Sequence, residues 1–400
     1  MRFDNVFIPY GAYWSTPFCK WQGSLATQNS LQLAAQCART ALQRLQISAD
    51  SFDALMLGMT VPQHHSFYGA PWLAALIGAP EISGPTIAQA CATGARVLAT
   101  AAAEIESGGA QTLLTVTADR CSNGPHIYYP NPAGPGGTGE KEDWVFDNFS
   151  NDPWALNAMI ETAEHVAREQ KITRGEQDEL TLLRFHQYQQ ALANDSAFLK
   201  RFMLLPLEVK DGRGKVVATV VGDEGVFATT SEGLAKLKPL QPDGTVTFGS
   251  QTHPADGNCG LIVCDRTRAQ ELARNRKIEV QVIAYGEARV EKGRMAKAPV
   301  PAARSALDRA GISITDCKVV KTHNPFAVND VYFSRELGLP VESFNNYGSS
   351  LIFGHPQGPT GTRLVIETIE ELAMKGGGYG LFAGCAAGDS GAAVVVKVNC

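Results

Sequence analysis

The stretch GPTIAQACATG, residues 84–94, runs directly into the alanine-rich stretch ARVLATAAAEI, residues 95–105. The first stretch predicts a short strand that enters a turn, and the second predicts a well-buried helix, so the fold belongs to the α/β class. Cys91 lies between them. Backbone N–H groups and the positive end of a helix favour a thiolate, which makes Cys91 a candidate nucleophile. The residue could equally be a small buried hydrophobe, as most free cysteines are.

The composition is that of an ordinary globular protein with room for a large core. Of the 400 residues, 44% are hydrophobic and 19% are charged. The formal net charge of −5 provides no attractive field for nucleic acid. The first residues, MRFDNVFIPY, lack the apolar centre of a signal peptide, and no apolar run has the length of a membrane span. We therefore expect no nucleic-acid partner and no membrane partner.

The cysteines and histidines predict neither disulfides nor a metal site. The nine cysteines are odd in number and scattered, and none forms a C-x-x-C pair, which indicates reduced thiols in a cytoplasmic protein. The eight histidines also lack ligand spacing. Adjacent His64 and His65 cannot easily face one metal ion from a strand or a helix.

Short apolar strands alternate with helices in both halves of the chain. In the first half we predict strands at residues 53–58, 111–117 and 216–221, helices at 72–77, 95–105, 154–169 and 173–193, and a loop at 123–139. In the second half we predict strands at 278–284, 317–322, 379–384 and 392–398 and helices at 301–310 and 361–375. The two halves have a similar outline, which favours an internal duplication over a single open sheet with one large insertion.

This outline divides the chain into three parts. Residues 1–120 form the first part of the N-terminal half, and residues 246–400 form the C-terminal half. Residues 121–245 form an inserted loop domain followed by the return to the N-terminal half.

Four short segments carry the chemistry, and each lies at a strand end or in a Gly-rich turn, where α/β proteins place functional residues. They are QACATG around Cys91, THNPF at 322–326, FGHPQGPTG at 353–361 and GCAAGDSG at 384–391. In this order and spacing the four segments resemble the motifs of the thiolase superfamily, and the resemblance extends nearly end to end. EGLAKLKP at 232–239, DGTVT at 243–247 and MIETAEHVA at 159–167 are similar to further signatures of that family.

The resemblance implies a fold and a substrate class. The fold would be two duplicated βαβαβαββ halves in a five-layer αβαβα arrangement, with the loop domain over the active site. The substrates would be coenzyme A thioesters, and no cofactor would be bound. The assembly would be a homodimer or homotetramer, with a small accessory subunit as a further option.

The resemblance also implies a role for each motif residue in Claisen chemistry. Cys91 would carry the acyl group, His355 would take its proton and keep it a thiolate, and Cys385 would be the second acid/base. One oxyanion site would use the backbone N–H groups of Cys91 and Ala387. The second would use His355 and a water held by His323. Substrate contacts would come from Thr252, Phe326, Met159 and Phe227.

Three positions depart from the usual family pattern. His323 stands where most members have Asn, which is similar to the sterol-carrier-protein type of thiolase. Ala386 and Ala387 stand in a turn that is usually glycine, and Asp389 either reshapes the pocket or caps the next segment. Phe227 lies where many members have a basic residue that contacts the nucleotide of coenzyme A.

The aromatic residues near these motifs have two interpretations. Residues 64–68 and Trp72 lie in a region that borders the partner subunit in the family, and Tyr128, Tyr129 and Trp144 lie in the loop that covers the acyl chain. They could line a pocket for a bulky or aromatic acyl group, or they could be ordinary packing residues.

Three functions remain open at this point. The leading one is a thiolase-type acyl-CoA C-acyltransferase that makes or cleaves a 3-oxoacyl-CoA. A decarboxylating condensing enzyme would also use a Cys-His-His set, although such enzymes have no second cysteine base. The third is an acyl-CoA-binding subunit of low intrinsic activity that acts with a partner protein.

Overall fold

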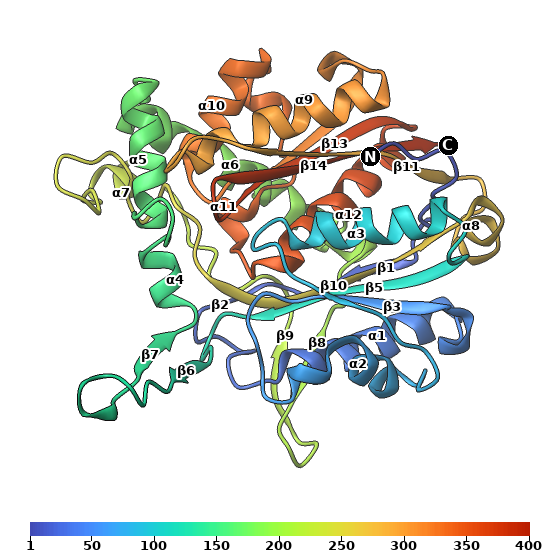
Figure 1. Ribbon diagram of the computed structural model, residues 1–400. Helices are drawn as coiled ribbons and strands as arrows, with labels where there is room; N and C mark the ends of the chain where they lie inside the picture. Colours follow the sequence, from blue (N-terminus) through green and yellow to red (C-terminus); the bar gives the residue numbers. More distant parts are fainter.

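The computed structural model describes residues 1–400 and contains two large sheets separated by a layer of helices (Figure 1), together with two two-stranded sheets. The first sheet has the strand order β1-β10-β5-β3-β4, and β2 also pairs with β10. Its strands are β1 (Tyr13–Ser15), β2 (Cys19–Lys20), β3 (Ala54–Gly58), β4 (Thr86–Ile87), β5 (Thr112–Arg120) and β10 (Ala255–Cys264). The second sheet has the order β11-β14-β13-β12, with β11 (Glu279–Arg289), β12 (Cys317–His323), β13 (Gly378–Ala386) and β14 (Ser390–Asn399).

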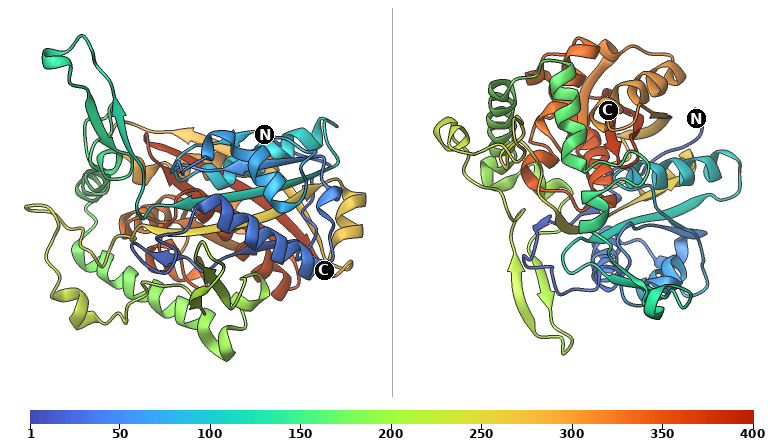
Figure 2. Two further views of the ribbon diagram at one scale, coloured as in Figure 1. Left: turned by 90° about the horizontal axis from the view of Figure 1, so that it is seen from below. Right: turned by 60° about the vertical axis from the view of Figure 1, so that its left-hand side comes forward.

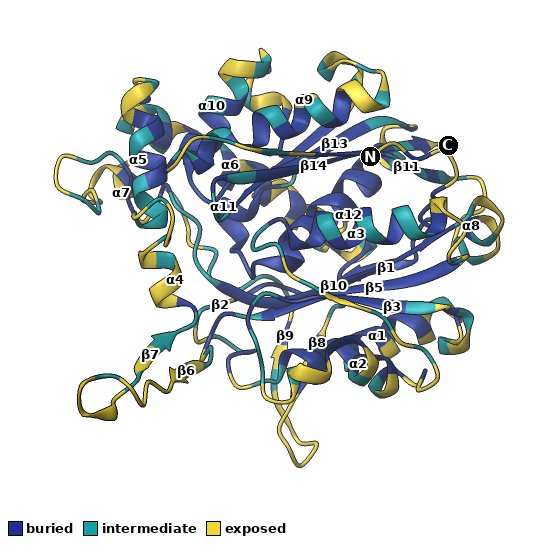
Figure 3. Ribbon diagram, in the orientation of Figure 1, coloured by how far each residue is buried: buried dark blue, intermediate teal, exposed yellow.

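Helices form three layers around and between the sheets, which gives the predicted αβαβα arrangement (Figures 1 and 2). The outer helices are α1 (Ser30–Leu45) and α2 (Gly69–Ile77) on one side and α9 (Pro299–Ala310) and α10 (Ala327–Leu337) on the other. The central layer consists of α3 (Thr93–Glu106) and α12 (Gly358–Met374). This layer and the strands on both sides of it are the most deeply buried part of the molecule (Figure 3).

The two halves repeat one topology. In the first half β1, α1, β3, α2, β4, α3, β5 and β10 follow one another, and in the second half β11, α9, β12, α10, α12, β13 and β14 do so. The order β1-β10-β5-β3 in one sheet corresponds to β11-β14-β13-β12 in the other. The predicted duplication is therefore present. The sheets divide after β10 and not at residue 246, because β10 forms its backbone hydrogen bonds with β5, β1 and β2.

The insertion between β5 and β10 lies along one side of the core (Figure 2). Its elements are β6 (His126–Tyr129), β7 (Glu140–Asp143), α4 (Phe146–Ser150), α5 (Met159–Glu169), α6 (Arg174–Ser196), β8 (Leu207–Lys210), β9 (Val216–Val220) and α7 (Ser231–Ala235). Two short helices elsewhere are α8 (Arg266–Leu272) and α11 (Ser350–Phe353). Thr173 caps α6 together with Glu176. No helix combines the length and the apolarity needed to cross a membrane.

Three predicted elements differ from the structure for local reasons. Residues 123–139 do not form a loop throughout, because His126–Tyr129 pairs with Glu140–Asp143 in a projecting hairpin. The helix predicted from residue 154 begins at Met159, because Asp152 holds the N–H groups of Trp154 and Ala155 in a turn. The strand predicted at 84–90 pairs only over Thr86–Ile87, since the chain turns before Cys91.

A buried ion-pair cluster ties the insertion to the core. Arg363 on α12 binds both oxygens of Asp223, at 2.7 and 2.8 Å, and also binds Glu367 at 2.9 Å. Asp223 further accepts hydrogen bonds from Tyr188 of α6 and from the backbone N–H of Phe18. Because a buried charge is stable only when its partners are in place, α6, α12 and residue 18 are fixed relative to one another.

The two central helices meet at their N-terminal ends without a side chain between them. A Cβ atom on Gly94 of α3 would lie 2.6 Å from the backbone N of Thr362 and 2.7 Å from the backbone O of Gly358. Both atoms belong to α12, so the close contact needs a residue without a side chain at position 94. This contact places the turn that precedes α3 beside the turn that precedes α12.

We predict that Gly94→Ala destabilises the protein by about 1–3 kcal/mol, since backbone atoms cannot yield to the added methyl group. Urea denaturation measures this change. The matched control is Gly212→Ala, because a Cβ on Gly212 meets nothing within 4 Å and should change the stability by less than about 0.5 kcal/mol. Equal stability of the Gly94 and Gly212 variants would contradict this account of the helix contact.

Candidate active site

Cys91 lies in a strained turn between β4 and α3, at the place predicted from the sequence. Ala90 adopts a left-handed conformation with φ of 43°, which a residue with a side chain rarely adopts. Thr93 stabilises the turn, because its hydroxyl donates to the carbonyl of Ala90 at 2.7 Å and accepts from the N–H of Gln89 at 2.8 Å. Strain of this kind is typical of functional sites, and Cys91 here lines a cavity.

His355 lies in the turn between α11 and α12. Gly354 before it has φ of 89°, and the N–H of His355 donates to the carbonyl of His253 at 3.0 Å. Asp119, at the end of β5, accepts from the N–H of Gly358 at 2.8 Å and from the N–H of Thr60 at 2.7 Å. The ends of β3 and β5 therefore hold the first turn of α12.

His323 and Cys385 come from the second sheet. β12 and β13 are parallel, and His323 at the end of β12 pairs with Gly384, the neighbour of Cys385. Because parallel strands end at the same edge of a sheet, the two side chains reach the same region. His323 stacks on His355 with ring centroids 4.0 Å apart and an interplanar angle of 30°. Both imidazoles are buried.

Three of the four catalytic residues predicted from the sequence lie close together, and two of them, Cys91 and His355, line a cavity. The sulfur of Cys91 and one ring nitrogen each of His323 and His355 lie within 4.8 Å of one another. The Nδ1 atoms of the histidines contact the hydroxyls of Ser350, at 2.7 Å, and Thr360, at 2.6 Å. Their Nε2 atoms are buried and have no hydrogen-bond partner.

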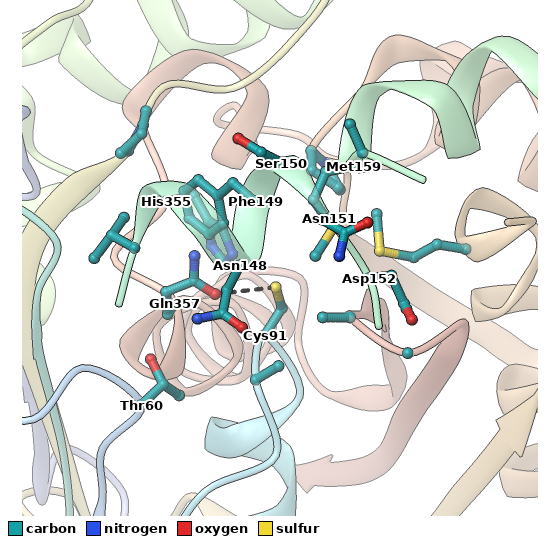
Figure 4. A pocket seen from close by; sticks show the side chains of 18 of the residues that line it. Thr60, Cys91, Asn148, Phe149, Ser150, Asn151, Asp152, Met159, His355 and Gln357 are labelled. Atoms are coloured by element: carbon teal, nitrogen blue, oxygen red, sulfur yellow. Dashed lines mark hydrogen bonds between the residues drawn. The ribbon is translucent and has the colours of Figure 1, made fainter. Parts of the chain in front are cut away.

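The thiol of Cys91 donates to the Oε1 atom of Gln357 at 3.2 Å (Figure 4). Gln357 is 7% exposed and has φ of 62°, and its amide faces the cavity next to Cys91. The sequence analysis missed this residue, although it is the variable position of the GHPQGPTG motif. The sequence signal that could have identified Gln357 was its position close to the motif histidine His355.

The electrostatics differ from the sequence-based expectation of a resting thiolate. Burial raises the pKa of the Cys91 thiol to about 12, although the N–H groups of Ala387 and Cys91 act in the opposite direction. Burial also lowers the pKa of His323 to about 3 and that of His355 well below its usual value. All three groups are therefore neutral at pH 7. The helix end was expected to lower the pKa of Cys91, but its effect is smaller than the opposite effect of burial.

Cys385 is held by a residue that the sequence analysis did not consider. Asn329 of α10 donates from Nδ2 to the sulfur at 3.3 Å, and its Oδ1 accepts from the N–H of Phe326. Burial raises the pKa of Cys385 well above its usual value, the nearby Cys91 raises it further, and Asn329 lowers it. Asn329 lies one helical turn after Phe326. The helical periodicity of α10 could therefore have indicated that Asn329 lies on the same face as this motif residue.

The cavity has a volume of about 810 Å³ and extends from Cys91 toward the insertion (Figure 4). Met159, Thr252, Phe326, His355, Ala387 and Cys91 all line it, as do the apolar side chains of Trp144, Phe149, Trp154 and Met295. A neighbouring pocket of about 480 Å³ shares Gln251, Thr252 and Pro254 with the cavity and contains Phe227 and His253. Phe227 therefore lies outside the main cavity and is 73% exposed.

Asp389 has a structural role, and the loop aromatic residues differ in where they lie. Asp389 accepts from the N–H groups of Gly293, at 2.8 Å, and Arg294, at 2.9 Å, so its carboxylate anchors a neighbouring turn. Of the loop aromatics, Trp144 lines the cavity, whereas Tyr128 and Tyr129 project from the exposed β6–β7 hairpin.

Comparison with known proteins identifies the family. Residues 12–267 match the family model "Thiolase, N-terminal domain", and residues 276–398 match "Thiolase, C-terminal domain". The chain belongs to the thiolase family. The predicted superfamily, fold and enzyme class are confirmed, so this thiolase is an acyltransferase of the acyl-CoA C-acyltransferase type.

Related proteins cover almost the full chain. It is 30% identical to the beta-ketoadipyl-CoA thiolase of Pseudomonas knackmussii over 396 residues, or 96% of each chain. It is 31% identical to the 3-oxoadipyl-CoA/3-oxo-5,6-dehydrosuberyl-CoA thiolase of Escherichia coli, over 96% of this chain and 97% of the relative. Human mitochondrial 3-ketoacyl-CoA thiolase in complex with CoA superposes with a TM-score of 0.89 at 27% identity, over 98% of each chain. The Bacillus anthracis acetyl-CoA acetyltransferase superposes with a TM-score of 0.91 at 27% identity, over 99% of each chain.

We predict that alkylation of Cys91 by iodoacetamide accelerates about tenfold per pH unit from pH 7 to 9.5. A thiol whose pKa is raised to about 12 gains thiolate in that proportion throughout the range. The histidines add no inflection near pH 6.5, because lowered pKa values keep them neutral there. The pKa of Asp119 is raised to about 7, so its ionisation near that pH shifts the alkylation rate of Cys91 as a whole but does not stop the rate from rising with pH. A plateau that begins below pH 7 would instead indicate a Cys91–His355 ion pair.

Proposed function

We propose that this thiolase makes or cleaves 3-oxoacyl-CoA through an acyl-enzyme on Cys91, with His355 and Cys385 as the acid/base groups. The observation that carries the proposal is the convergence of Cys91, His355 and the Ala387 turn at the end of one cavity. The N–H groups of Ala387 and Cys91 already approach the sulfur, which supports their role as donors to an acyl oxyanion.

The first proton transfer accompanies the attack by sulfur. Both Cys91 and His355 are neutral beforehand, and the buried Nε2 atom of His355 has no other partner. His355 therefore takes the thiol proton as the S–C bond forms, while Thr360 holds its Nδ1 atom. His355 then passes this proton to the sulfur of the departing coenzyme A, which completes the first half of the reaction. The second oxyanion site is proposed at His355 and a water held by the adjacent His323.

The second proton transfer uses Cys385. Burial raises the pKa of the Cys385 thiol well above its usual value, so the thiolate needs a partner that favours it. Asn329 then favours the Cys385 thiolate by donating to its sulfur. We propose that Cys385, held by Asn329, moves the α-proton of the second thioester.

The cavity favours an acyl group larger than acetyl. Its volume of about 810 Å³ and its aromatic and methionine side chains suit a bulky apolar chain or ring. The adjoining pocket with Thr252, His253 and Phe227 is the proposed path of coenzyme A. The relatives from Pseudomonas and Escherichia are named for beta-ketoadipyl, 3-oxoadipyl and 3-oxo-5,6-dehydrosuberyl groups, which are larger than acetyl and support the size, though not the apolar character, of the proposed acyl group.

The proposed assembly is a homodimer or homotetramer. Phe67 is 96% exposed and Tyr68 is 67% exposed, on the segment that borders the partner subunit in the family. The proposed compartment is the cytoplasm, since the chemistry needs Cys91 and Cys385 as free thiols and all nine cysteines are unpaired. A small accessory subunit is excluded as a requirement if the purified chain is active alone.

We predict that incubation with acyl-CoA adds the mass of one acyl group to Cys91. Intact-protein mass spectrometry and peptide mapping detect it, and Cys91→Ala should abolish it together with turnover. The control Cys317→Ala, at the start of β12, should acylate normally. An unlabelled but folded wild-type chain would favour the acyl-CoA-binding subunit.

We predict that kcat/KM for thiolysis of 3-oxooctanoyl-CoA or 3-oxo-3-phenylpropionyl-CoA exceeds that for acetoacetyl-CoA by about tenfold or more, since each buried methylene contributes roughly 0.8 kcal/mol. Thioester absorbance provides the assay. Phe149→Trp, which fills the cavity, should reverse the order by excluding the bulky chain. Condensation that requires malonyl-CoA would favour the decarboxylating enzyme instead.

A further inference from the structure

Three side chains suited to a soft divalent metal ion meet at the end of the cavity. One potential ligand atom each of Cys91, His323 and His355 lies within 4.8 Å of the others. A thiolate and two imidazoles, with a fourth position open to water, form a ligand set typical of zinc. The residues come from three distant parts of the chain, so sequence spacing gave no sign of the cluster.

The histidines are oriented as metal ligands usually are. In each ring the Nδ1 atom contacts a hydroxyl, that of Ser350 for His323 and that of Thr360 for His355. The remaining Nε2 atoms are buried without a partner. Outer hydrogen bonds of this kind fix the ring orientation and leave the second nitrogen available to a metal ion.

The distances require only a small contraction. An ion at the centre of a triangle with 4.8 Å sides would lie about 2.8 Å from each corner, and zinc bonds measure roughly 2.0–2.3 Å. Each ligand atom therefore needs to move by about 0.5–0.8 Å. Side-chain rotation of Cys91, which is partly exposed to the cavity, provides the larger part of this movement, and small shifts of the two histidines together with their hydroxyl partners provide the rest.

We propose that Cys91, His323 and His355 bind one zinc ion, which blocks the nucleophile and holds the enzyme in a reversible inactive state. The Zn–S bond forms as the thiol proton leaves to the buffer, and no electron is transferred. A water from the cavity takes the fourth position. The metal site is independent of the proposed function, whereas the inactive state rests on the role of Cys91.

The charges around the site are compatible with this step. Zinc and one thiolate leave a net charge of +1, and the carboxyl group of Asp119 lies close enough to act on the Cys91 thiol. A thiol ligand loses its proton when it binds zinc, whereas the Nε2 atoms of the two histidines have no hydrogen-bond partner to give up. Binding should therefore release about one proton per zinc.

Calorimetric titration of the metal-free full chain with zinc chloride, in buffers of different ionisation enthalpy, tests the site. We expect one zinc ion per chain, about one proton released, and an affinity at least about 100-fold lower in Cys91→Ser and His323→Asn. Cobalt(II) provides a second readout, because a thiolate-to-cobalt absorption band should appear in the wild type and vanish in Cys91→Ser. His323→Gln replaces His323→Asn if the latter does not fold.

Two controls separate this site from other ligands. The double variant His64→Ala, His65→Ala removes an exposed histidine pair, and Cys385→Ser removes the nearby thiol outside the cluster; both should keep the wild-type zinc affinity. Unchanged affinity in both His323 variants would overturn the proposal. Loss of binding in either control would also overturn it.

Inhibition is measured separately from binding. Zinc should prevent acylation and alkylation of Cys91, compete with acyl-CoA and be reversed by a chelator. Stoichiometric zinc binding without such protection would overturn the proposed inactive state. If zinc binds but Cys91 is never acylated by any thioester, the proposed function fails while the metal site stands.

Discussion

The backbone contact between α3 and α12 at Gly94 is the constraint on which the active site depends. The two helices come from different halves of the duplicated fold, and each begins directly after a catalytic turn. Their contact at the N-terminal ends brings those turns together. The parallel pairing of β12 with β13 adds His323 and Cys385 from the second sheet. A site assembled from both halves thus needs no flexible segment to position its catalytic groups.

Burial decides the charge state of this site. Cys91, His323 and His355 are all neutral because the surrounding protein disfavours their charged forms. A neutral thiol is a weak nucleophile, so the enzyme avoids side reactions until a thioester accepts the sulfur as its proton leaves. The same low polarity strengthens the oxyanion contacts once charge develops on the substrate.

Much of the fold and the principal motif residues could be predicted from the sequence. The strand–turn–helix pattern around Cys91 and the GHPQGPTG turn are local, and local patterns are visible in a sequence. Gln357 and Asn329 were missed because their contacts with sulfur join segments more than 50 residues apart. The raised pKa of the Cys91 thiol could not be predicted, because a sequence shows helix ends but does not show how deeply a thiol is buried. The β6–β7 hairpin was missed because the Pro and Gly residues between its two strands predict a loop, and the residues that pair on either side were not recognised as strands.

The ion-pair cluster around Asp223 fixes the insertion against the core, and this limits the motions that could admit a substrate. Tyr188 of the insertion and Arg363 of the core share the same buried carboxylate. Swinging the whole insertion away would leave the guanidinium of Arg363 without its main counter-ion in an apolar interior, which is strongly unfavourable. The insertion is therefore a fixed wall and not a hinged lid. The part of the cavity lined by residues 148–154 lies outside this cluster, so the ion pairs do not restrain it.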